Sequence, residues 1–196
     1  MALITTLFLQ VLSNLANDLG DAQKGTDNAD RIGPERAVQS GAITVVQMKR
    51  ALYLFGVLSL VSGITLIYFS FGIEKFLLSM LFLALGLAAI WASVKYTLGK
   101  NPYGYRGRGD LFVFLFFGLT AVIGVYFLIS KSFNPWVILP ASTMGLFAAG
   151  VLNLNNLRDC ENDKANGKNT IIVKIGFEKG RFYHLFLLAT GWILML

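Results

Sequence analysis

The stretch NLANDLGDAQKGTD, residues 14 to 27, places carboxylates and amides at helical spacing directly after an apolar run. Asn17, Asp18 and Asp21 lie three, four and seven residues after Asn14, so one helix face would present all four. Asp27 follows within the same stretch. The C-terminal end of a helix carries partial negative charge and repels carboxylates unless a cation compensates. The pattern therefore predicts a positively charged partner here.

A second stretch, NNLRDCENDK at residues 155 to 164, repeats the pattern with Asn156, Asp159 and Asp163. Carboxylate and amide oxygens suit Mg²⁺, which commonly joins one or two carboxylates to a substrate phosphate. A solvated loop charge explains any one of these acids, but two matching clusters favour metal binding. We interpret both clusters as parts of one magnesium and diphosphate site.

Basic side chains accompany both clusters. Most loop cations only set membrane topology, and each of these taken singly fits that role. Beside a carboxylate-held metal, however, Lys and Arg can bind a diphosphate and stabilise it as a leaving group. The basic residues in question are Arg36, Lys100, Arg106, Arg158, Lys164 and Lys168.

Other catalytic chemistry finds little support. His184 is the sole histidine and precedes the last apolar run, so a Ser–His–Asp set cannot be assembled. Cys160, the sole cysteine, excludes an internal disulfide, and no histidine stands near it to activate the thiol. There is no Walker-type GxxxxGK[ST], and GYRGRG follows no predicted strand, so a nucleotide site is not indicated.

The elements that must position these residues are membrane helices. A 196-residue chain with 55% hydrophobic residues and a mean hydropathy of +0.62 belongs to the membrane class. A spanning helix needs roughly 20 apolar residues. Four runs are long enough, and they are 51–71, 76–94, 111–130 and 136 to about 154. Two shorter runs cover 1–15 and 183–196, at the two ends of the sequence.

The basic residues follow this topology rather than forming a nucleic-acid surface. All but two of the 17 fall in the connections 16–50, 95–110 and 155–182, and the exceptions are Lys75 and Lys131. The positive-inside rule then places these three connections, with both acidic clusters, in the cytoplasm. No alternating strand pattern is present, so we predict a single all-α, multi-pass transmembrane bundle over residues 1–196. Glycines within the runs favour close helix packing.

The quoted stretches resemble a known family, the UbiA-type intramembrane prenyltransferases. NDLGDAQKGTD is similar to the family's first aspartate-rich motif and DCEND to its second, while YTLGK, residues 96–100, matches its YxxxK element. ERAVQSGAIT matches the segment in which an Arg precedes a Ser-Gly pair. NPYGYRGRGDLFVFLFFG most resembles the branch whose acceptor is 1,4-dihydroxy-2-naphthoate, in menaquinone biosynthesis.

The resemblance implies an enzyme of the bacterial inner membrane. It would transfer the group of a polyprenyl diphosphate to the naphthoate ring, release diphosphate and CO₂, and yield a demethylmenaquinone. The predicted metal ligands, here for Mg²⁺, are Asn17, Asp18, Asp21, Asp27, Asp159 and Asp163. The residues predicted to act in catalysis are Asp21, Tyr96, Lys100 and Asp159. Those predicted to bind substrate are Asn14, Lys24, Arg36, Arg106, Asn156, Arg158 and Lys164.

The resemblance also implies about nine helices, of which this sequence supplies roughly six. The first helix and those after Leu196 would be missing, and the cavity would lack walls on at least two sides. Activity is therefore expected of a full-length relative rather than of this chain alone. Two alternatives stay open. One is a family member with another acceptor such as 4-hydroxybenzoate, and the other is a non-enzymatic divalent-cation transporter or binding protein that uses the same carboxylates.

Overall fold

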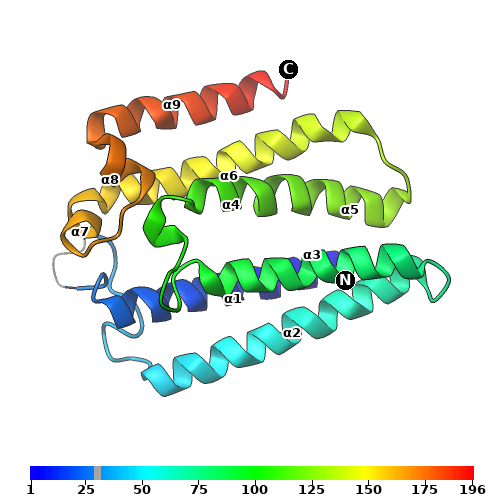
Figure 1. The fold of residues 1–196 in the computed structure, drawn as a ribbon, viewed down its shortest axis with the longest axis horizontal. Coiled ribbons are helices and arrows are strands. Elements are labelled where there is room, and N and C mark those ends of the chain that lie inside the picture. The colour runs from blue at the N-terminus through cyan, green and yellow to red at the C-terminus, as the bar shows by residue number, and fades with distance from the viewer. Residues whose placement is uncertain (29–31) are drawn as a thin grey trace. The chain divides into compact units, whose positions relative to one another are not determined.

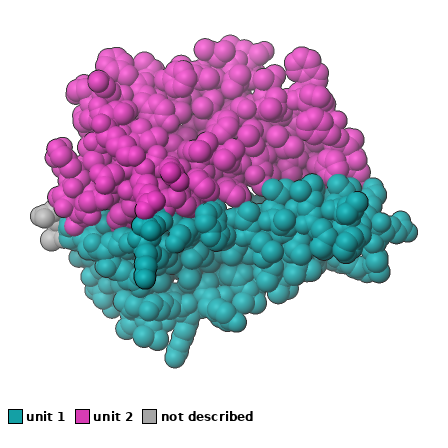
Figure 2. All heavy atoms as spheres, in the orientation of Figure 1, with its two compact units in different colours: residues 1–28, 35–102 teal, residues 29–34, 103–196 magenta. Residues whose placement is uncertain are grey.

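Helices make up the regular structure of this chain, for which a computed structural model describes residues 1–28 and 32–196 (Figure 1). Arg31, one of the basic residues of the first connection, lies outside these ranges. Within them no strand is present, which confirms the predicted all-α class. The chain divides into two compact units, residues 1–28 with 35–102 and residues 29–34 with 103–196 (Figure 2).

The first unit consists of three helices that pack against one another. They are α1 (Ala2–Lys24), α2 (Val45–Phe71) and α3 (Phe76–Lys95). Thr44 starts α2 with a capping box: its hydroxyl accepts from the Gln47 amide, and the Gln47 side chain accepts from the Thr44 amide. The preceding helix, α1, ends at Gly25, which adopts a left-handed conformation with φ of 74°.

The second unit contains the remaining helical elements. A helix from residue 109 to 130 is continuous and consists of α4 (Gly109–Val113), a π-helical segment η2 (Phe114–Thr120) and α5 (Ala121–Ser130). α6 (Ile138–Arg158) packs against η2 and against α9 (Phe177–Ile193). The shorter elements are η1 (Gly104–Arg106), η3 (Pro135–Val137), α7 (Cys160–Ala165) and α8 (Ile171–Ile175).

Five helices of the described chain are long and apolar enough to cross a membrane. Four of them match the predicted runs, and the fifth is α1, where the short apolar run 1–15 continues as helix through the acidic stretch. α2 begins six residues before the predicted start at Ala51, because the capping box at Thr44 opens the helix earlier. The predicted multi-pass membrane architecture is confirmed by these helices.

Close helix contact in the second unit depends on Gly118 and Gly145. A Cβ atom on Gly118 would lie 2.5 Å from the Gly145 Cα atom and 2.7 Å from the Ala141 carbonyl oxygen. Both obstacles are backbone atoms, which cannot move aside as a flexible side chain could. The predicted packing role therefore holds at these two glycines, whereas Gly56 and Gly86 have open space around them.

We expect Gly118→Ala to lower the free energy of unfolding by about 2 kcal/mol, as overpacking against rigid neighbours does. Thermal unfolding in detergent measures this effect. Gly86→Ala is the matched control, since it adds the same methyl group to a spanning helix with nothing within 4 Å. Equal unfolding temperatures for the two variants would contradict the close contact between η2 and α6.

Candidate functional site

The acidic stretch at residues 14–27 is the last part of α1 and the turn that follows it. Asp18 and Asp21 lie on the final helical turns, and Asp27 follows the left-handed Gly25. The carboxylates of Asp21 and Asp27 are almost fully buried, with side-chain exposures of 3% and 1%, while that of Asp18 is 27% exposed. Burial of charged groups requires compensation by partners of opposite charge.

Arg36 provides that compensation. Its guanidinium bonds to the Asp18 carboxylate, lies 3.3 Å from Asp27 Oδ1 and 4.0 Å from Asp21 Oδ2. Burial by itself lowers the pKa of Arg36, but the three carboxylates outweigh it and raise that pKa. A positively charged side chain is therefore present beside these carboxylates within the first unit, whereas the Mg²⁺ predicted between the two acidic clusters stays a prediction. Arg36 was predicted to contact substrate, and that role stays a prediction.

The two asparagines of this stretch differ in their surroundings. With its amide oxygen turned toward Arg36, Asn17 accepts from both terminal guanidinium nitrogens at 3.2 Å. Asn14, by contrast, is exposed and its Oδ1 accepts from Gln10 Nε2 at 3.3 Å. Asn17, Asp18, Asp21 and Asp27 thus gather around one guanidinium, which makes a cluster that we call the Arg36 cluster.

The predicted YxxxK element lies at the end of α3 and in the turn after it. Lys24 at the end of α1 reaches this turn, where its Nζ donates to the Gly99 carbonyl oxygen at 3.3 Å. Tyr96 is half-buried and Lys100 is exposed. The structure therefore brings the acidic end of α1 and the turn containing Tyr96 and Lys100 together within one unit.

The second acidic stretch begins at the end of α6 in the second unit. Asp159 separates α6 from α7, and both of its carboxylate oxygens accept from Arg158, at 2.8 Å from Nε and 2.7 Å from Nη2. Asn156 is buried one turn earlier. Arg158 was predicted to bind substrate, and its observed partner is the neighbouring carboxylate.

Lys168 is the lysine close to the Asp163 carboxylate, whereas the role predicted for Lys164 was substrate binding. Lys168 Nζ lies 3.6 Å from Asp163 Oδ1 and 5.4 Å from the centre of the Tyr105 ring. Lys168 as a whole is buried, with 8% of its surface exposed. Lys164 is exposed on the surface of α7. The turn at Gly167, which has φ of 71°, returns the chain so that Lys168 faces Asp163. The sequence NGKN at residues 166–169, which is typical of a turn, is the signal that could have predicted this contact.

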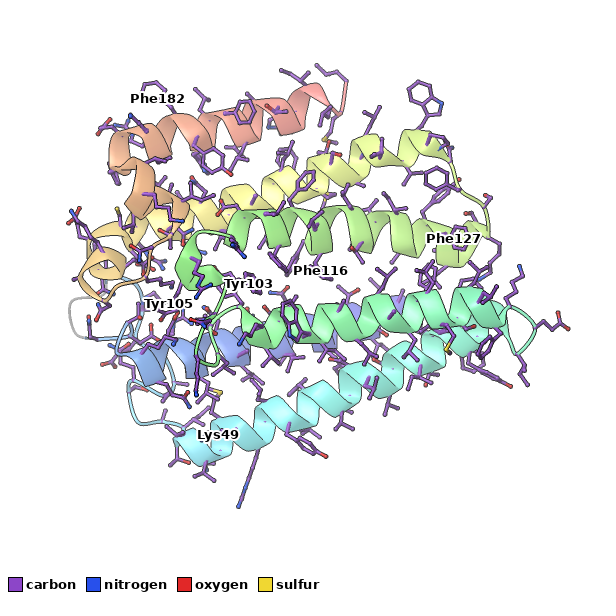
Figure 3. The ribbon with its side chains drawn as sticks, in the orientation of Figure 1. Lys49, Tyr103, Tyr105, Phe116, Phe127 and Phe182 are labelled. Atoms are coloured by element: carbon purple, nitrogen blue, oxygen red, sulfur yellow. The ribbon has the colours of Figure 1, made fainter. Side chains whose placement is uncertain are left out.

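The GYRGRG loop is held against the segment that follows Asp163. Figure 3 shows Tyr103 and Tyr105 on this loop, ahead of the helix that carries Phe116. The Asn169 amide donates to the Tyr105 carbonyl oxygen at 3.1 Å, and Lys174 Nζ donates to the Arg106 carbonyl oxygen at 2.6 Å. Arg106, which was predicted to bind substrate, is exposed. The sequence did not predict that this loop lies next to Asp163 and Lys168.

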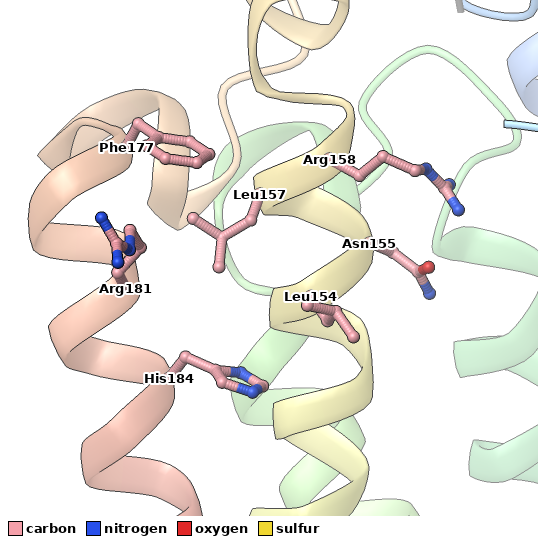
Figure 4. Close-up of a pocket in the computed structure, with 7 residues that line it drawn as sticks. All are labelled: Leu154, Asn155, Leu157, Arg158, Phe177, Arg181 and His184. Atoms are coloured by element: carbon pink, nitrogen blue, oxygen red, sulfur yellow. The ribbon is translucent and has the colours of Figure 1, made fainter. Parts of the chain in front are cut away.

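α6 and α9 border a pocket of about 620 Å³ (Figure 4). His184 lines it, and its Nδ1 lies 3.0 Å from Asn153 Oδ1 across the two helices. Because an amide oxygen only accepts, His184 donates to it in the tautomer that carries the proton on Nδ1. The histidine therefore has a side-chain partner within the second unit. The pocket is lined by Leu154, Asn155, Leu157, Arg158, Phe177, Arg181 and His184.

Cys160 is buried against Leu157 and Ile172 at the start of α7. Burial raises the pKa of its thiol, and the charges of Glu161 and Asp163 raise it further, while Lys164 acts in the opposite direction. Because only the thiolate is nucleophilic, we expect slow alkylation of the native protein at pH 7.5 and faster alkylation as the pH rises through this pKa. Labelling followed by mass spectrometry, with unfolded protein as reference, measures the rates. Equal rates in native and unfolded protein would contradict the buried position.

The Arg36 cluster offers the oxygen ligands that Mg²⁺ prefers. Three carboxylates and an amide surround one cationic group, so the cluster stabilises positive charge in a confined space. Across the described residues, no three acidic, histidine or cysteine side chains are close enough to hold a metal by themselves. A metal ion bound here would therefore need ligands beyond these side chains, such as water or a phosphate.

Comparison with known proteins identifies the family of this chain. The sequence model of the UbiA prenyltransferase family matches residues 1–196. The chain belongs to this family. The matched range includes both acidic stretches and the YxxxK element.

Several relatives in the family carry the same functional description, "1,4-dihydroxy-2-naphthoate octaprenyltransferase". The protein of that name from Haemophilus influenzae is 48% identical over 97% of this chain, and the one from Escherichia coli is 48% identical over 96%. The Mycobacterium tuberculosis protein is 34% identical over 99%. The chain spans 61%, 60% and 63% of these relatives' lengths. No solved structure matches the chain.

Proposed function

We propose that the protein transfers a polyprenyl group from polyprenyl diphosphate to 1,4-dihydroxy-2-naphthoate. The observation that carries this proposal is the 48% identity, over nearly the whole chain, to two proteins named for that acceptor. The single domain over residues 1–196, the bacterial inner membrane and the cytoplasmic location of both acidic stretches belong to the same proposal. Basic residues concentrated in the connections that hold these stretches support the orientation.

In the proposed reaction the C–O bond between the prenyl C1 atom and the diphosphate breaks first. The diphosphate leaves with the electron pair, and an allylic carbocation remains. The electron-rich ring carbon that carries the carboxylate attacks C1, the bond to that carboxylate then breaks, and CO₂ departs. The electron pair released restores the aromatic ring, so the product is demethylmenaquinone in its reduced form.

Residues of both clusters would act on the departing diphosphate. We propose Asn17, Asp18, Asp21 and Asp27 as magnesium ligands in the first unit, and Asp159 and Asp163 in the second. When bound, Mg²⁺ would neutralise charge on the diphosphate and make it a better leaving group. Lys24, Arg36, Lys100, Arg106, Arg158 and Lys164 are the cations proposed to contact its oxygens, with Asn14 and Asn156 as amide contacts.

The surroundings support a role in handling charge away from water. Asp21 and Asp27 are almost fully buried beside Arg36, so their interaction with a cation is stronger than it would be in water. An apolar prenyl chain is compatible with the spanning helices, and shielding from water protects a carbocation from hydrolysis. Tyr96 is proposed to lie near the reacting carbon.

Membranes from cells that express the protein at its natural length provide the test. With polyprenyl diphosphate and Mg²⁺, we expect 1,4-dihydroxy-2-naphthoate to give a prenylated quinol and stoichiometric CO₂, and 4-hydroxybenzoate to give neither. Chelation by EDTA should stop the reaction, and added Mg²⁺ should restore it. Product from 4-hydroxybenzoate alone would overturn the acceptor, and full activity in EDTA would overturn the metal.

A further inference from the structure

A buried contact joins the acidic end of α1 to the turn after α3. Thr97 is fully buried, and its Oγ1 donates a hydrogen bond to the Ala16 carbonyl oxygen at 2.7 Å. That carbonyl is also in position to accept from the amide of residue 20 within the helix, so Thr97 shares an acceptor of α1 itself. A hydroxyl buried at this depth would be costly without such a partner.

Gly20 makes this approach possible. A Cβ atom at position 20 would lie 2.5 Å from both Cβ and Oγ1 of Thr97 and 2.9 Å from its carbonyl carbon. Real Cβ atoms do not come so close to other heavy atoms, so any larger residue must push α1 and the turn apart. The contact therefore depends both on the absence of a side chain at Gly20 and on the hydroxyl of Thr97.

The residues next to this contact are ones assigned to the proposed site. Asp21 follows Gly20 directly in the chain, and Tyr96 precedes Thr97. The bond from Lys24 Nζ to the Gly99 carbonyl oxygen ties the same two segments at a second point, on the surface. The two hydrogen bonds attach to α1 at Ala16 and Lys24, about two helical turns apart, and so restrict both the rotation of α1 and its displacement along its axis.

We infer that Gly20 and Thr97 are positioning residues, which set the register between the Arg36 cluster and the turn that carries Tyr96 and Lys100. Neither residue touches a substrate in this inference. Both act through their neighbours, in the way that outer-shell groups orient metal ligands. The inference rests on the proposed function, because the reaction defines which register is productive.

The first test uses Thr97→Val, which keeps the shape of the side chain and removes its hydroxyl. We expect kcat to fall about tenfold and the Mg²⁺ concentration at half-maximal rate to rise several-fold, within the range of about 10- to 100-fold known for lost outer-shell partners. Thr97→Ser retains the hydroxyl and should recover kcat to within about threefold. Thr65→Val is the matched control, since that hydroxyl bonds only to Val61 in its own helix among the bonds described, and it should behave as wild type.

The second test uses Gly20→Ala, with Gly56→Ala as its control. Both add one methyl group to a helix, but only position 56 has open space around it. We expect Gly20→Ala to reproduce the loss in kcat and the change in Mg²⁺ dependence, and Gly56→Ala to match wild type. Unfolding temperatures in detergent show whether each variant has folded.

The outcomes separate this inference from the proposed function. If wild type and Gly56→Ala, each expressed at the protein's natural length, form no prenylated product, the proposed function fails. If they are active and Thr97→Val retains wild-type kcat and Mg²⁺ dependence, the positioning role is overturned. A lowered unfolding temperature in Thr97→Val with unchanged kinetics would overturn it as well, since the contact would then serve stability alone.

Discussion

Replacing Asp21 by Asn should reduce prenyl transfer more than about 100-fold, since even outer-shell partners of metal ligands are worth about 10- to 100-fold. The amide keeps the size of the side chain and removes its negative charge. Asp21 is 2% exposed and lies in the Arg36 cluster, so water cannot replace the lost oxygen ligand. Turnover of polyprenyl diphosphate in membranes, measured over a range of Mg²⁺ concentrations, provides the readout.

Asp159→Asn is the corresponding change in the second acidic stretch, and we expect a loss of similar size. Glu74→Gln is the control for both, because it removes a carboxylate from an exposed residue between α2 and α3, outside the proposed site. Near-normal turnover of both Asn variants would refute the metal assignment. Loss in only one of them would show that the two stretches do not act on the same diphosphate.

Arg36→Gln should lower the stability of the protein and make that stability more dependent on Mg²⁺. The substitution leaves three neighbouring carboxylates without the guanidinium that contacts them. A fully buried pair would cost more, but the Arg36 side chain is 20% exposed, so we expect a loss of roughly 2 kcal/mol in the free energy of unfolding. Added Mg²⁺ should recover part of this loss, because it supplies positive charge to the same oxygens.

Thermal unfolding of Arg36→Gln in detergent, with and without 10 mM Mg²⁺ as roughly saturating ligand, measures both effects. Arg50→Gln removes an exposed cation from α2 and should leave the unfolding temperature unchanged. If Arg36→Gln unfolds at the wild-type temperature, the guanidinium is not needed to hold the carboxylates together. If Mg²⁺ stabilises it no more than wild type, the metal does not use these oxygens.

Fold class followed from the sequence because burial in lipid leaves few choices. Runs of about 20 apolar residues can satisfy their backbone groups only as helices, so four spans were predicted close to their observed limits. Ends were less predictable where local caps decide them. The capping box at Thr44 and the continuation of α1 through its acidic stretch involve polar residues, which hydropathy alone assigns to loops.

The grouping of candidate site residues could be predicted from the sequence where their spacing matched helical periodicity. Asn17, Asp18 and Asp21 were predicted on one helix face, and they meet at Arg36. The partner of these acids is 15 to 19 residues away along the chain, and no period connects it to them. Its place in the cluster depends on how the connection after Gly25 folds, which only the tertiary structure shows.

The sequence by itself determined which residues are proposed for the site, because side-chain chemistry and helical periodicity are local properties. It identified the acidic stretches, the membrane helices and the kind of ligand that they suit. Only the tertiary structure decided which groups touch. Thr97 bonds to Ala16 across Gly20, and Lys168 rather than Lys164 meets Asp163. Such contacts join residues far apart in the chain or across a tight turn, so they depend on the path of the backbone rather than on any spacing in the sequence.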